Sequence, residues 1–139
     1  MTQNEKDLLL KDLCARLSYG VKCASGVDDA TLIIEGINPN CCGASEVQVT
    51  YERSGINFNT TISTIKPYLF PLSSMTEEQK KEYDSIIYHN VELHWERYYD
   101  VIDVDWFEVL QDFYNKNHLD YRGLIHMGLA IDATGLNIY

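Results

Sequence analysis

The densest cluster of reactive side chains in the sequence is the run Asp120-Tyr121-Arg122-Gly123. The planar guanidinium of Arg122 can hold a phosphate or carboxylate through two parallel hydrogen bonds. The ring of Tyr121 can stack on a base or on another ring. The structural alternative is that Asp120 caps the last helix and pairs with Arg122 while Tyr121 packs, and such local capping is the commoner arrangement. We take Tyr121 and Arg122 as candidate binding residues and keep both interpretations.

The histidines and cysteines lack the spacing of a metal site. No HExxH or similar pattern joins the four histidines, which are His89, His94, His118 and His126. Zinc sites favour two pairs of ligands, each pair separated by a few residues. Among the four cysteines only Cys41 and Cys42 are close, and these two are adjacent. Cys14 lies on the apolar stripe of a predicted helix, so we expect it in the core. We expect no metal, no disulfide framework and no cofactor.

Catalytic motifs are also missing from the sequence. It contains no nucleophile elbow, P-loop or dinucleotide-binding glycine pattern. Asp103 and Asp105 form a carboxylate pair, but nothing in the sequence places them around a cleft. We assign no catalytic residue and favour a protein that does not catalyse a reaction. The alternative is an enzyme of small substrates with a site among the histidines and acids.

Acidic residues are concentrated in one stretch of the chain. The net charge is −10, and residues 77–112 contain eleven acids against Lys80, Lys81 and Arg97, a local balance of −8. The broad basic footprint of a nucleic-acid-binding surface is absent, so we expect no direct nucleic-acid binding. One interpretation of the acidic stretch is a solvated helical surface. The other is a surface that binds a basic partner.

Aromatic residues crowd into the same stretch, where Tyr88, Trp95, Tyr98, Tyr99 and Trp106 occur. Tyrosine and tryptophan combine a large apolar area with a polar tip, and protein interfaces are enriched in them. A cluster of core aromatics is the alternative. We take Trp95, Tyr98 and Tyr99 as further candidate binding residues.

Length and composition suit one globular domain covering residues 1–139. The chain is 45% hydrophobic and 23% charged, which is ordinary for a globular protein. No apolar run approaches the roughly 18 residues of a membrane helix. The first residues lack the basic-then-apolar order of a signal peptide. We therefore expect a cytoplasmic protein that does not enter a membrane.

The first half of the chain is predicted to form a helix and several strands. Leu9, Leu13 and Leu17 recur every four residues, which predicts an amphipathic helix over residues 3–17 that ends at Gly20. β-Branched and alternating segments predict strands at 21–24, 31–35, 46–52 and 56–62. The last two strands are joined by a turn at Ser54-Gly55.

The centre of the chain is divided by two prolines. Pro67 and Pro71 predict an extended, irregular segment over residues 65–75 that is pinned to the core by its apolar side chains. Thr76 and Gln79 then match a capping box, which starts a helix that we expect to run to about residue 89.

The sequence does not decide whether residues 91–95 form a strand or a helix. Apolar and polar residues alternate there like a strand, yet the same residues continue a helical stripe. We prefer a break near Asn90. A helix over 105–117 follows, with Phe107, Leu110, Phe113 and Tyr114 on one face, and residues 118–129 are expected to form a turn and a short helix. The predicted fold is α+β, with an N-terminal helix and a C-terminal helical group on an antiparallel sheet of three to five strands.

Two blocks of the sequence resemble a known family: residues 66–79 (KPYLFPLSSMTEEQ) and 117–125 (NHLDYRGLI). Residues 12–21 and 128–133 are also similar. The family consists of short uncharacterised proteins of anaerobic gut bacteria and of their phages and prophages. The blocks cover under half of the chain, and the segments 24–64 and 86–107 match nothing in it. The resemblance implies an origin in a phage or mobile element more than an activity.

These observations lead us to expect a non-catalytic accessory protein that binds a host component and inhibits or sequesters it. The expected target is a component of the host's antiviral defence. A protein target predicts an exposed patch of acidic and aromatic residues. A small nucleotide-like ligand predicts a pocket where Arg122, or another basic residue, and a tyrosine converge. A third possibility is a structural accessory protein with only a homo-oligomer interface.

Overall fold

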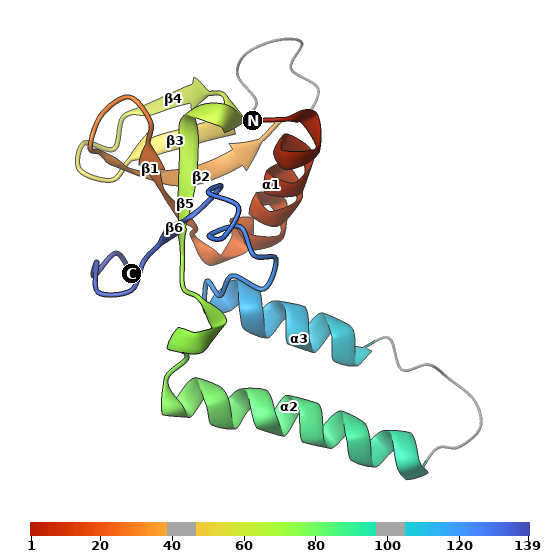
Figure 1. Cartoon of the computed structure of the whole chain (residues 1–139). Helices are drawn as coiled ribbons and strands as arrows, with labels where there is room; N and C mark the ends of the chain where they lie inside the picture. Colours follow the sequence, from red (N-terminus) through yellow and green to blue (C-terminus); the bar gives the residue numbers. More distant parts are fainter. Residues whose placement is uncertain (39–46, 97–104) are drawn as a thin grey trace.

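The computed structural model of the chain describes residues 1–38, 47–96 and 105–139, without the side chains of residues 89–96 and 105–106. Its helices and strands are α1 (Gln3–Arg16), β1 (Lys22–Ser25), β2 (Thr31–Ile37), β3 (Val47–Tyr51), β4 (Asn57–Thr60), β5 (Ile65–Leu69), α2 (Glu77–Glu96), α3 (Asp105–Lys116) and β6 (Ile131–Asp132). Figure 1 shows a body, made of α1 and the sheet, from which α2 and α3 project as a helical arm.

The described strands form one sheet in the order β4-β3-β2-β1-β5-β6. Neighbouring strands are antiparallel except β5 and β6, which pair in parallel. The α+β class is therefore confirmed, with an N-terminal helix, a mostly antiparallel sheet and two later helices. The six strands exceed the predicted three to five, because neither β5 nor β6 was predicted as a strand.

The first part of the predicted irregular segment over 65–75 is a strand, β5, whereas residues 70–75 are irregular as predicted apart from a 3-10 turn at Leu72–Ser74. Strand β5 pairs with β1, and Pro67 stands opposite Cys23. Proline removes one backbone donor and is tolerated near a sheet edge. The short edge strand β6 pairs with β5 only from Tyr68 onward, one residue after the proline. Pairing with distant residues explains why local sequence signals did not reveal this strand.

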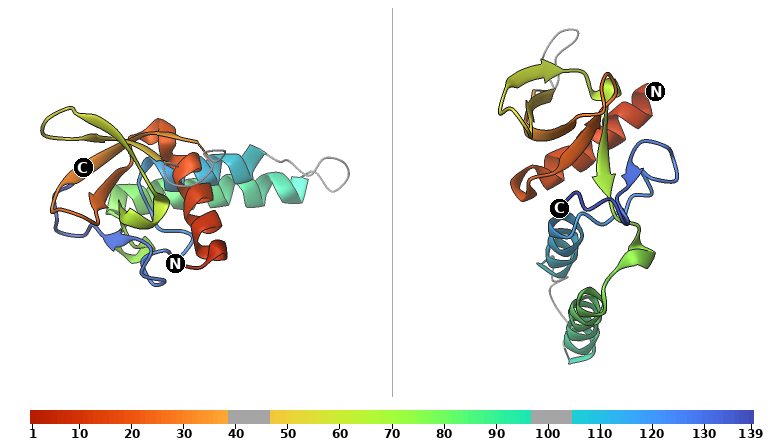
Figure 2. Two further views of the ribbon diagram at one scale, coloured as in Figure 1. Left: turned by 90° about the horizontal axis from the view of Figure 1, so that it is seen from above. Right: turned by 90° about the vertical axis from the view of Figure 1, so that its left-hand side faces the viewer.

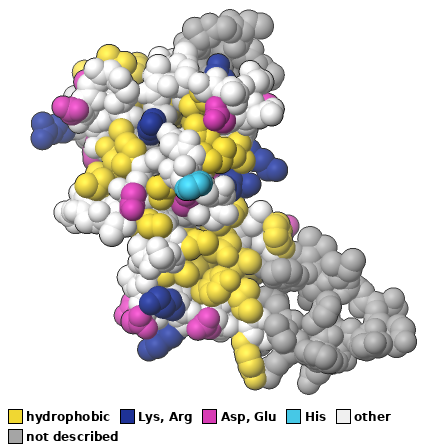
Figure 3. Space-filling model, viewed as in Figure 1, with side chains coloured by type: hydrophobic (Ala, Val, Ile, Leu, Met, Phe, Trp, Pro, Cys, Tyr) yellow, Lys and Arg dark blue, Asp and Glu magenta, His cyan; other side chains and the backbone are white. Residues whose placement is uncertain are grey.

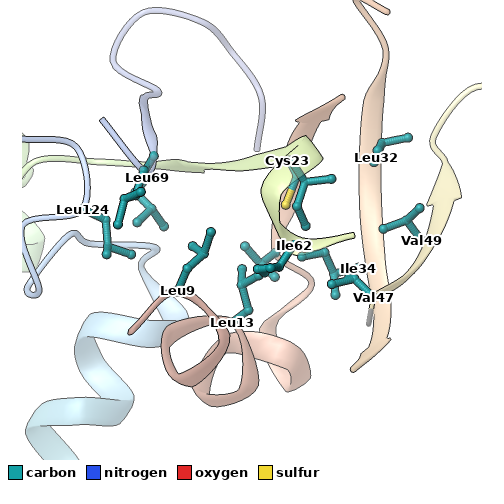
Figure 4. Packing of buried hydrophobic residues seen from close by; sticks show 14 residues of the cluster. Leu9, Leu13, Cys23, Leu32, Ile34, Val47, Val49, Ile62, Leu69 and Leu124 are labelled. Carbon is teal, nitrogen blue, oxygen red and sulfur yellow. The ribbon is translucent and has the colours of Figure 1, made fainter. Parts of the chain in front are cut away.

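Helix α1 packs against the sheet and supplies the centre of the core. Thr2 and Glu5 form a capping box at its start. A 3-10 turn over Leu17–Tyr19 continues the helix, and Gly20 then takes the predicted left-handed conformation. Leu9 and Leu13 are fully buried. Figure 4 shows them among side chains from the sheet and the C-terminal turns, including Cys23, Ile34, Val47, Ile62, Leu69 and Leu124.

Cys14 is exposed, so its predicted place in the core is wrong. The buried side of α1 consists of Leu9, Asp12, Leu13 and Arg16, at the three- and four-residue spacing of one helix face. Asp12 and Arg16 can occupy this face because they form an ion pair with each other. Two charged residues therefore continue the leucine stripe, and Cys14 points to solvent.

Helix α2 runs unbroken from Glu77 to Glu96, so the predicted break near Asn90 is wrong and the helical alternative is correct. Its start has the predicted capping box. Gln79 N–H donates to Thr76 Oγ1 (3.2 Å), and Thr76 N–H donates to Gln79 Oε1 (2.9 Å). No proline or glycine interrupts the helix, and its apolar stripe outweighs the short alternation of polar and apolar residues.

Residues 121–130 form turns and bends instead of the predicted short helix. Gly123 and Gly128 have φ angles of 74° and 72°, in the left-handed region that a right-handed helix excludes. The turns bring the chain back to the body, where β6 joins the edge of the sheet.

The two helices of the arm run antiparallel and lie in layers. Helix α3 contacts α1 on one side and α2 on the other, so α2 forms the outer layer (Figure 2). Figure 1 and the left-hand view of Figure 2 show the far ends of α2 and α3 extending beyond the body. Among the described helices, none has the length and apolar composition needed to cross a membrane.

Candidate binding surface

The body and the arm meet where α1, the end of α3 and residues 118–122 come together, and we call this region the joint. It contains a buried ion-pair network. Asp12 is fully buried and accepts hydrogen bonds from Arg16 Nε (2.7 Å), Arg16 Nη2 (3.1 Å) and Arg122 Nε (3.1 Å). Arg16 is also fully buried, whereas the side chain of Arg122 is 17% exposed. One carboxylate therefore faces two guanidinium groups in a site from which water is largely excluded.

Arg16 connects α1 to the end of α3. Its Nη2 donates to the carbonyl of Leu119 (2.7 Å), and its Nη1 donates to the carbonyl of Tyr114 (3.4 Å). Tyr114 lies in the last turn of α3, where carbonyls lack partners within the helix. A positive charge at this end also interacts favourably with the helix dipole. Arg16 thus fixes α3 against α1.

A backbone bridge joins the two segments that connect the arm to the body. Phe70, which follows β5, pairs with Leu119, which follows α3. Phe70 N–H donates to the carbonyl of His118 (2.9 Å), and Asp120 N–H donates to the carbonyl of Phe70 (2.8 Å). This bridge and the hydrogen bonds of Arg16 attach the arm to the body.

The predicted binding residues Tyr121 and Arg122 come together at the same joint. The guanidinium carbons of Arg122 and Arg16 lie 4.7 Å and 5.4 Å from the centre of the Tyr121 ring. Tyr121 stacks on Tyr114, with ring centres 4.9 Å apart and ring planes 13° apart. Cations and rings attract each other in such an arrangement. Both residues therefore help to connect the C-terminal turns with α1 and α3.

The structural alternative for the run at 120–123 is right that Asp120 acts as a cap, although it caps a turn and not a helix, and it is wrong for Arg122. The carboxylate of Asp120 caps the following turn by accepting the N–H groups of Leu124 (2.8 Å) and Ile125 (2.9 Å). Arg122 pairs with Asp12 on α1. Because two backbone donors already occupy the carboxylate of Asp120, the distant Asp12 is the partner that Arg122 finds.

His118 is a buried and neutral member of the joint. It has a φ angle of 52°, is 8% exposed, and stacks on Tyr139 with ring centres 3.8 Å apart. Burial, assisted by the positive charges of Arg16 and Lys22, lowers the pKa of His118 to about 4. The imidazole therefore carries no charge at neutral pH and contributes through packing.

Three buried side-chain atoms near the joint have no hydrogen-bond partner within the described ranges: Asn115 Oδ1, His118 Nδ1 and Tyr121 Oη. Buried polar atoms of this kind usually bind ordered water. No group of three or more metal-binding side chains occurs in the part of the chain that the structure describes.

Sequence reasoning missed Asp12, Arg16 and His118. A signal for the first two was present, because Asp12 and Arg16 have the four-residue spacing of a helical ion pair and lie beside the buried Leu13. No local signal pointed to His118, whose burial depends on the distant Tyr139.

The second feature with functional potential is the apolar side of α3. At 100° per residue, Val109, Phe113, Leu110, Tyr114 and Phe107 span an arc of roughly 160° around the helix. Its inner part is covered, since Phe113 is 1% exposed. At its two margins, Val109 is 49% exposed and Phe107 is 53% exposed. Figure 3 shows hydrophobic side chains gathered over this part of the molecule.

Helix α2 covers only part of this arc. The ring centre of Tyr83 lies 6.0 Å from that of Phe113 and 6.3 Å from that of Tyr114. Ile86 and Ile87, one turn further along α2, are only half-buried, and Tyr88 is 63% exposed. Apolar side chains on both described helices of the arm, such as Tyr88 and Val109, are therefore partly exposed.

The described part of the arm is also acidic. Two of its three lysines are paired within the arm, Lys80 with Glu77 and Lys116 with Glu82, whereas Lys81 forms no ion pair with a described residue. Glu78, Asp84 and Glu108 form no ion pair with any described residue. Asp112 accepts a hydrogen bond from the hydroxyl of Tyr19 (3.1 Å), which leaves its charge in place. An apolar margin flanked by acids results.

The remaining predicted site residues lie in the far part of the arm. Trp95 belongs to the last turn of α2, but its side chain lies outside the described residues. Tyr98 and Tyr99 lie outside them entirely. The structure thus brings Tyr121 and Arg122 together and leaves the prediction for the other three as it stands.

The chain matches no protein-family model, no curated protein and no solved structure.

Proposed function

We propose that the protein is a non-catalytic binding protein that presents its helical arm to a protein partner. The observation that carries this proposal is Val109, which lies on the apolar side of α3 and is 49% exposed. Isolated exposed apolar residues are common on proteins. Here Val109 lies on the apolar side of a helix that also carries the exposed acids Glu108 and Asp112. Apolar surface within a charged surround is typical of a protein interface.

The partner in this proposal is a component of a bacterial host, bound in the cytoplasm and inhibited or sequestered by an accessory protein of a phage or mobile element. Support comes from the resemblance of residues 66–79 and 117–125 to short proteins of gut bacteria and their phages. Both segments contribute to the joint that mounts the arm. Antiviral defence is the host system that we propose as the target.

A small nucleotide-like ligand is the second candidate. It is supported by the convergence of Arg122 and Tyr121 and by the unpartnered hydroxyl of Tyr121. Against it, Arg16 is fully buried and engaged by Asp12 and two carbonyls, which leaves a single guanidinium for an anion. Native mass spectrometry of protein purified from a bacterial host separates the two. A small mass released on unfolding would favour the ligand, and a bare chain favours the protein partner.

Site-specific photo-cross-linking tests the arm directly. A photoreactive amino acid is placed at Val109 on the arm or at Val27, an exposed valine of the body (86% exposed). In a bacterial host we expect a discrete adduct with one protein from position 109 and none from position 27. Adducts from position 27 alone, or from neither position, would contradict the use of the arm.

The inhibitory role is tested by plating phage on a host that carries an antiviral defence system. Expression of the wild-type chain is expected to restore plating. Val109→Glu is expected to abolish this effect, and Val27→Glu is expected to retain it. Unchanged plating together with empty pull-downs from host lysate would refute the role in defence.

A further inference from the structure

We infer that the outer edge of β4 is a dimerisation site, where β4 of a second copy of this chain adds as an antiparallel strand and joins the two sheets into one. Strand β4 is the last strand on its side of the sheet, and no described residue pairs with its outer edge. Figure 1 and the right-hand view of Figure 2 show β4 on the part of the body that is remote from the arm. Dimerisation here leaves the arm accessible and does not depend on what the arm binds.

The hydrogen bonds of the sheet show which backbone groups of β4 point outward. Tyr51 N–H donates to the carbonyl of Ile56 (3.0 Å), across the ladder between β3 and the strand that follows. Backbone groups alternate in direction along an antiparallel strand, so every second residue from Ile56 onward directs its groups toward β3. Asn57 and Asn59, which lie between them and are exposed, direct their N–H and C=O groups away from the sheet. These groups are free to pair with another strand.

The sequence of β4 lacks the features that keep an edge strand from pairing. Natural edge strands are protected by charged side chains and by proline. Residues 54–61 (SGINFNTT) contain neither. The opposite edge of the sheet contains both, because β6 pairs with β5 only from Tyr68 onward, and the preceding part of β5 contains Lys66 and Pro67. Of the two edges of the described sheet, the one at β4 is therefore suited to pairing.

One register of two β4 strands satisfies all of the outward groups. When Phe58 lies on a two-fold axis perpendicular to the sheet, Asn57 of each copy stands opposite Asn59 of the other. Each such pair can exchange both N–H···O=C hydrogen bonds. The neighbouring registers would need the N–H of Gly55 or the carbonyl of Thr61, and these groups are already bonded within the chain (2.9 and 3.1 Å). The strand is thus complementary to its own symmetry copy.

The side chains also match in this register. Phe58 is partly buried, and its ring centre lies 4.8 Å from that of Tyr51. On the axis it would meet Phe58 of the other copy, which would cover the part of the ring that its own sheet leaves open. Asn57 accepts a hydrogen bond from Thr50 through Oδ1, so its side-chain N–H₂ can donate across the strands to Asn59 of the other copy.

The distribution of charge permits a second copy to bind at this edge. Like charges that face each other across paired strands are destabilising, but residues 54–61 carry no charge. Glu52 and Arg53 precede the strand, so the antiparallel arrangement places those of the two copies at opposite ends of the paired strands. The interface is small, because only one short strand from each copy contributes to it. We therefore expect a weak dimer, with a dissociation constant on the order of 100 μM.

Sedimentation equilibrium of the full chain, at concentrations up to about 1 mM, measures this association. Asn59→Pro removes an outward N–H that its own sheet does not use, and we expect it to raise the dissociation constant about tenfold or more. Circular dichroism checks that this variant folds. Asn59→Lys places a charge at the edge and is expected to have the same effect. Its matched control is Gln48→Lys, since Gln48 is exposed and stands opposite Asn59 on β3.

Amide hydrogen exchange followed by NMR locates the interface. The amides of Asn57 and Asn59 point outward, so we expect them to exchange rapidly in dilute protein and to become protected as the dimer forms. The amide of Phe58 is directed toward β3 and is expected to be protected at every concentration. Protection that rises with concentration at Asn57 and Asn59 alone would therefore identify the outer edge as the contact.

Several results would overturn the dimer proposed here. One is a chain that remains monomeric at about 1 mM. Another is a dimer that Asn59→Lys leaves intact, or that Gln48→Lys weakens equally. A dimer that Val109→Glu dissociates, or that leaves Asn57 and Asn59 unprotected, would place the contact elsewhere. If Asn59→Pro does not fold, Asn59→Lys decides the question. These measurements use the purified chain alone, so their outcome is separate from that of photo-cross-linking at Val109.

Discussion

Replacing Asp12 by asparagine is expected to destabilise the protein strongly. The carboxylate of Asp12 accepts three hydrogen bonds from two guanidinium groups, at 2.7, 3.1 and 3.1 Å. Asparagine has a similar shape but offers one acceptor oxygen and turns an N–H₂ group toward the guanidinium groups. Arg16, which is fully buried, then keeps its charge without a counter-ion. Breaking a buried pair in this way costs about 3–5 kcal/mol.

This cost converts into a measurable change in the melting temperature. The unfolding entropy is about 2.1 cal/mol/K per residue, or roughly 0.3 kcal/mol/K for 139 residues. A loss of about 3–5 kcal/mol therefore lowers the melting temperature by about 10–17 °C. Urea unfolding followed by circular dichroism measures the same change in free energy, with the midpoint shifted and the slope unchanged.

The control for this prediction is Asp7→Asn on the same helix. Asp7 is exposed and accepts a hydrogen bond from Gln3, so its replacement is expected to change stability by less than about 0.5 kcal/mol. A cost of under about 1 kcal/mol for Asp12→Asn would refute the argument that the pair is desolvated. Amide exchange gives a second readout, because the variant is expected to lose protection at the end of α3, where Arg16 holds two carbonyls.

Two further predictions concern His118 and Gly26. Since the pKa of His118 is about 4 in the folded protein and about 6.5 when unfolded, the unfolded chain binds more protons between these values, and stability falls as pH drops. Between about pH 7 and pH 5 the free energy of unfolding of the wild type is expected to fall by up to about 2 kcal/mol more than that of His118→Asn. Urea unfolding measures this difference, and equal losses in the two proteins would contradict the prediction. His126→Asn is the control, and it is expected to behave like the wild type. A Cβ at Gly26 would lie 2.7 Å from the carbonyl oxygen of Thr64, so Gly26→Ala is expected to cost about 1–3 kcal/mol. Gly36→Ala, which meets only a flexible side chain at 3.4 Å, is expected to stay within about 1 kcal/mol in the same measurement.

The elements that the sequence predicted well are those built from local patterns. The capping boxes at Thr2 and Thr76 depend on side chains three residues apart, and both are present. The alternating strand around Val47 and Val49 also formed, since period-two alternation needs no distant information. The part of α2 beyond Asn90 was wrongly predicted to leave the helix, because the five alternating residues 91–95 fit the period of a strand as well as that of a helix.

What could not be predicted depends on contacts between distant parts of the chain. Pro67 lies in a strand only because β1 pairs with it. Tyr121 and Arg122 were identified as chemically capable groups, but the partner of Arg122 is Asp12, 110 residues earlier. Cys14 was assigned to the core because a charged face on α1 is unexpected unless the ion pair between Asp12 and Arg16 is known. The exposed margin at Val109 likewise depends on how little of α3 is covered by α2.

The bridge between Phe70 and Leu119 makes the arm an exchangeable module. The chain leaves the body at Phe70 and returns beside it at Leu119, about one strand spacing away. An inserted segment of another length or composition can therefore begin and end at the same two residues without shifting the register of the sheet. Loop-closure entropy grows only slowly with the length of such an insertion. One body can accordingly carry arms of different length and composition while the core residues stay the same.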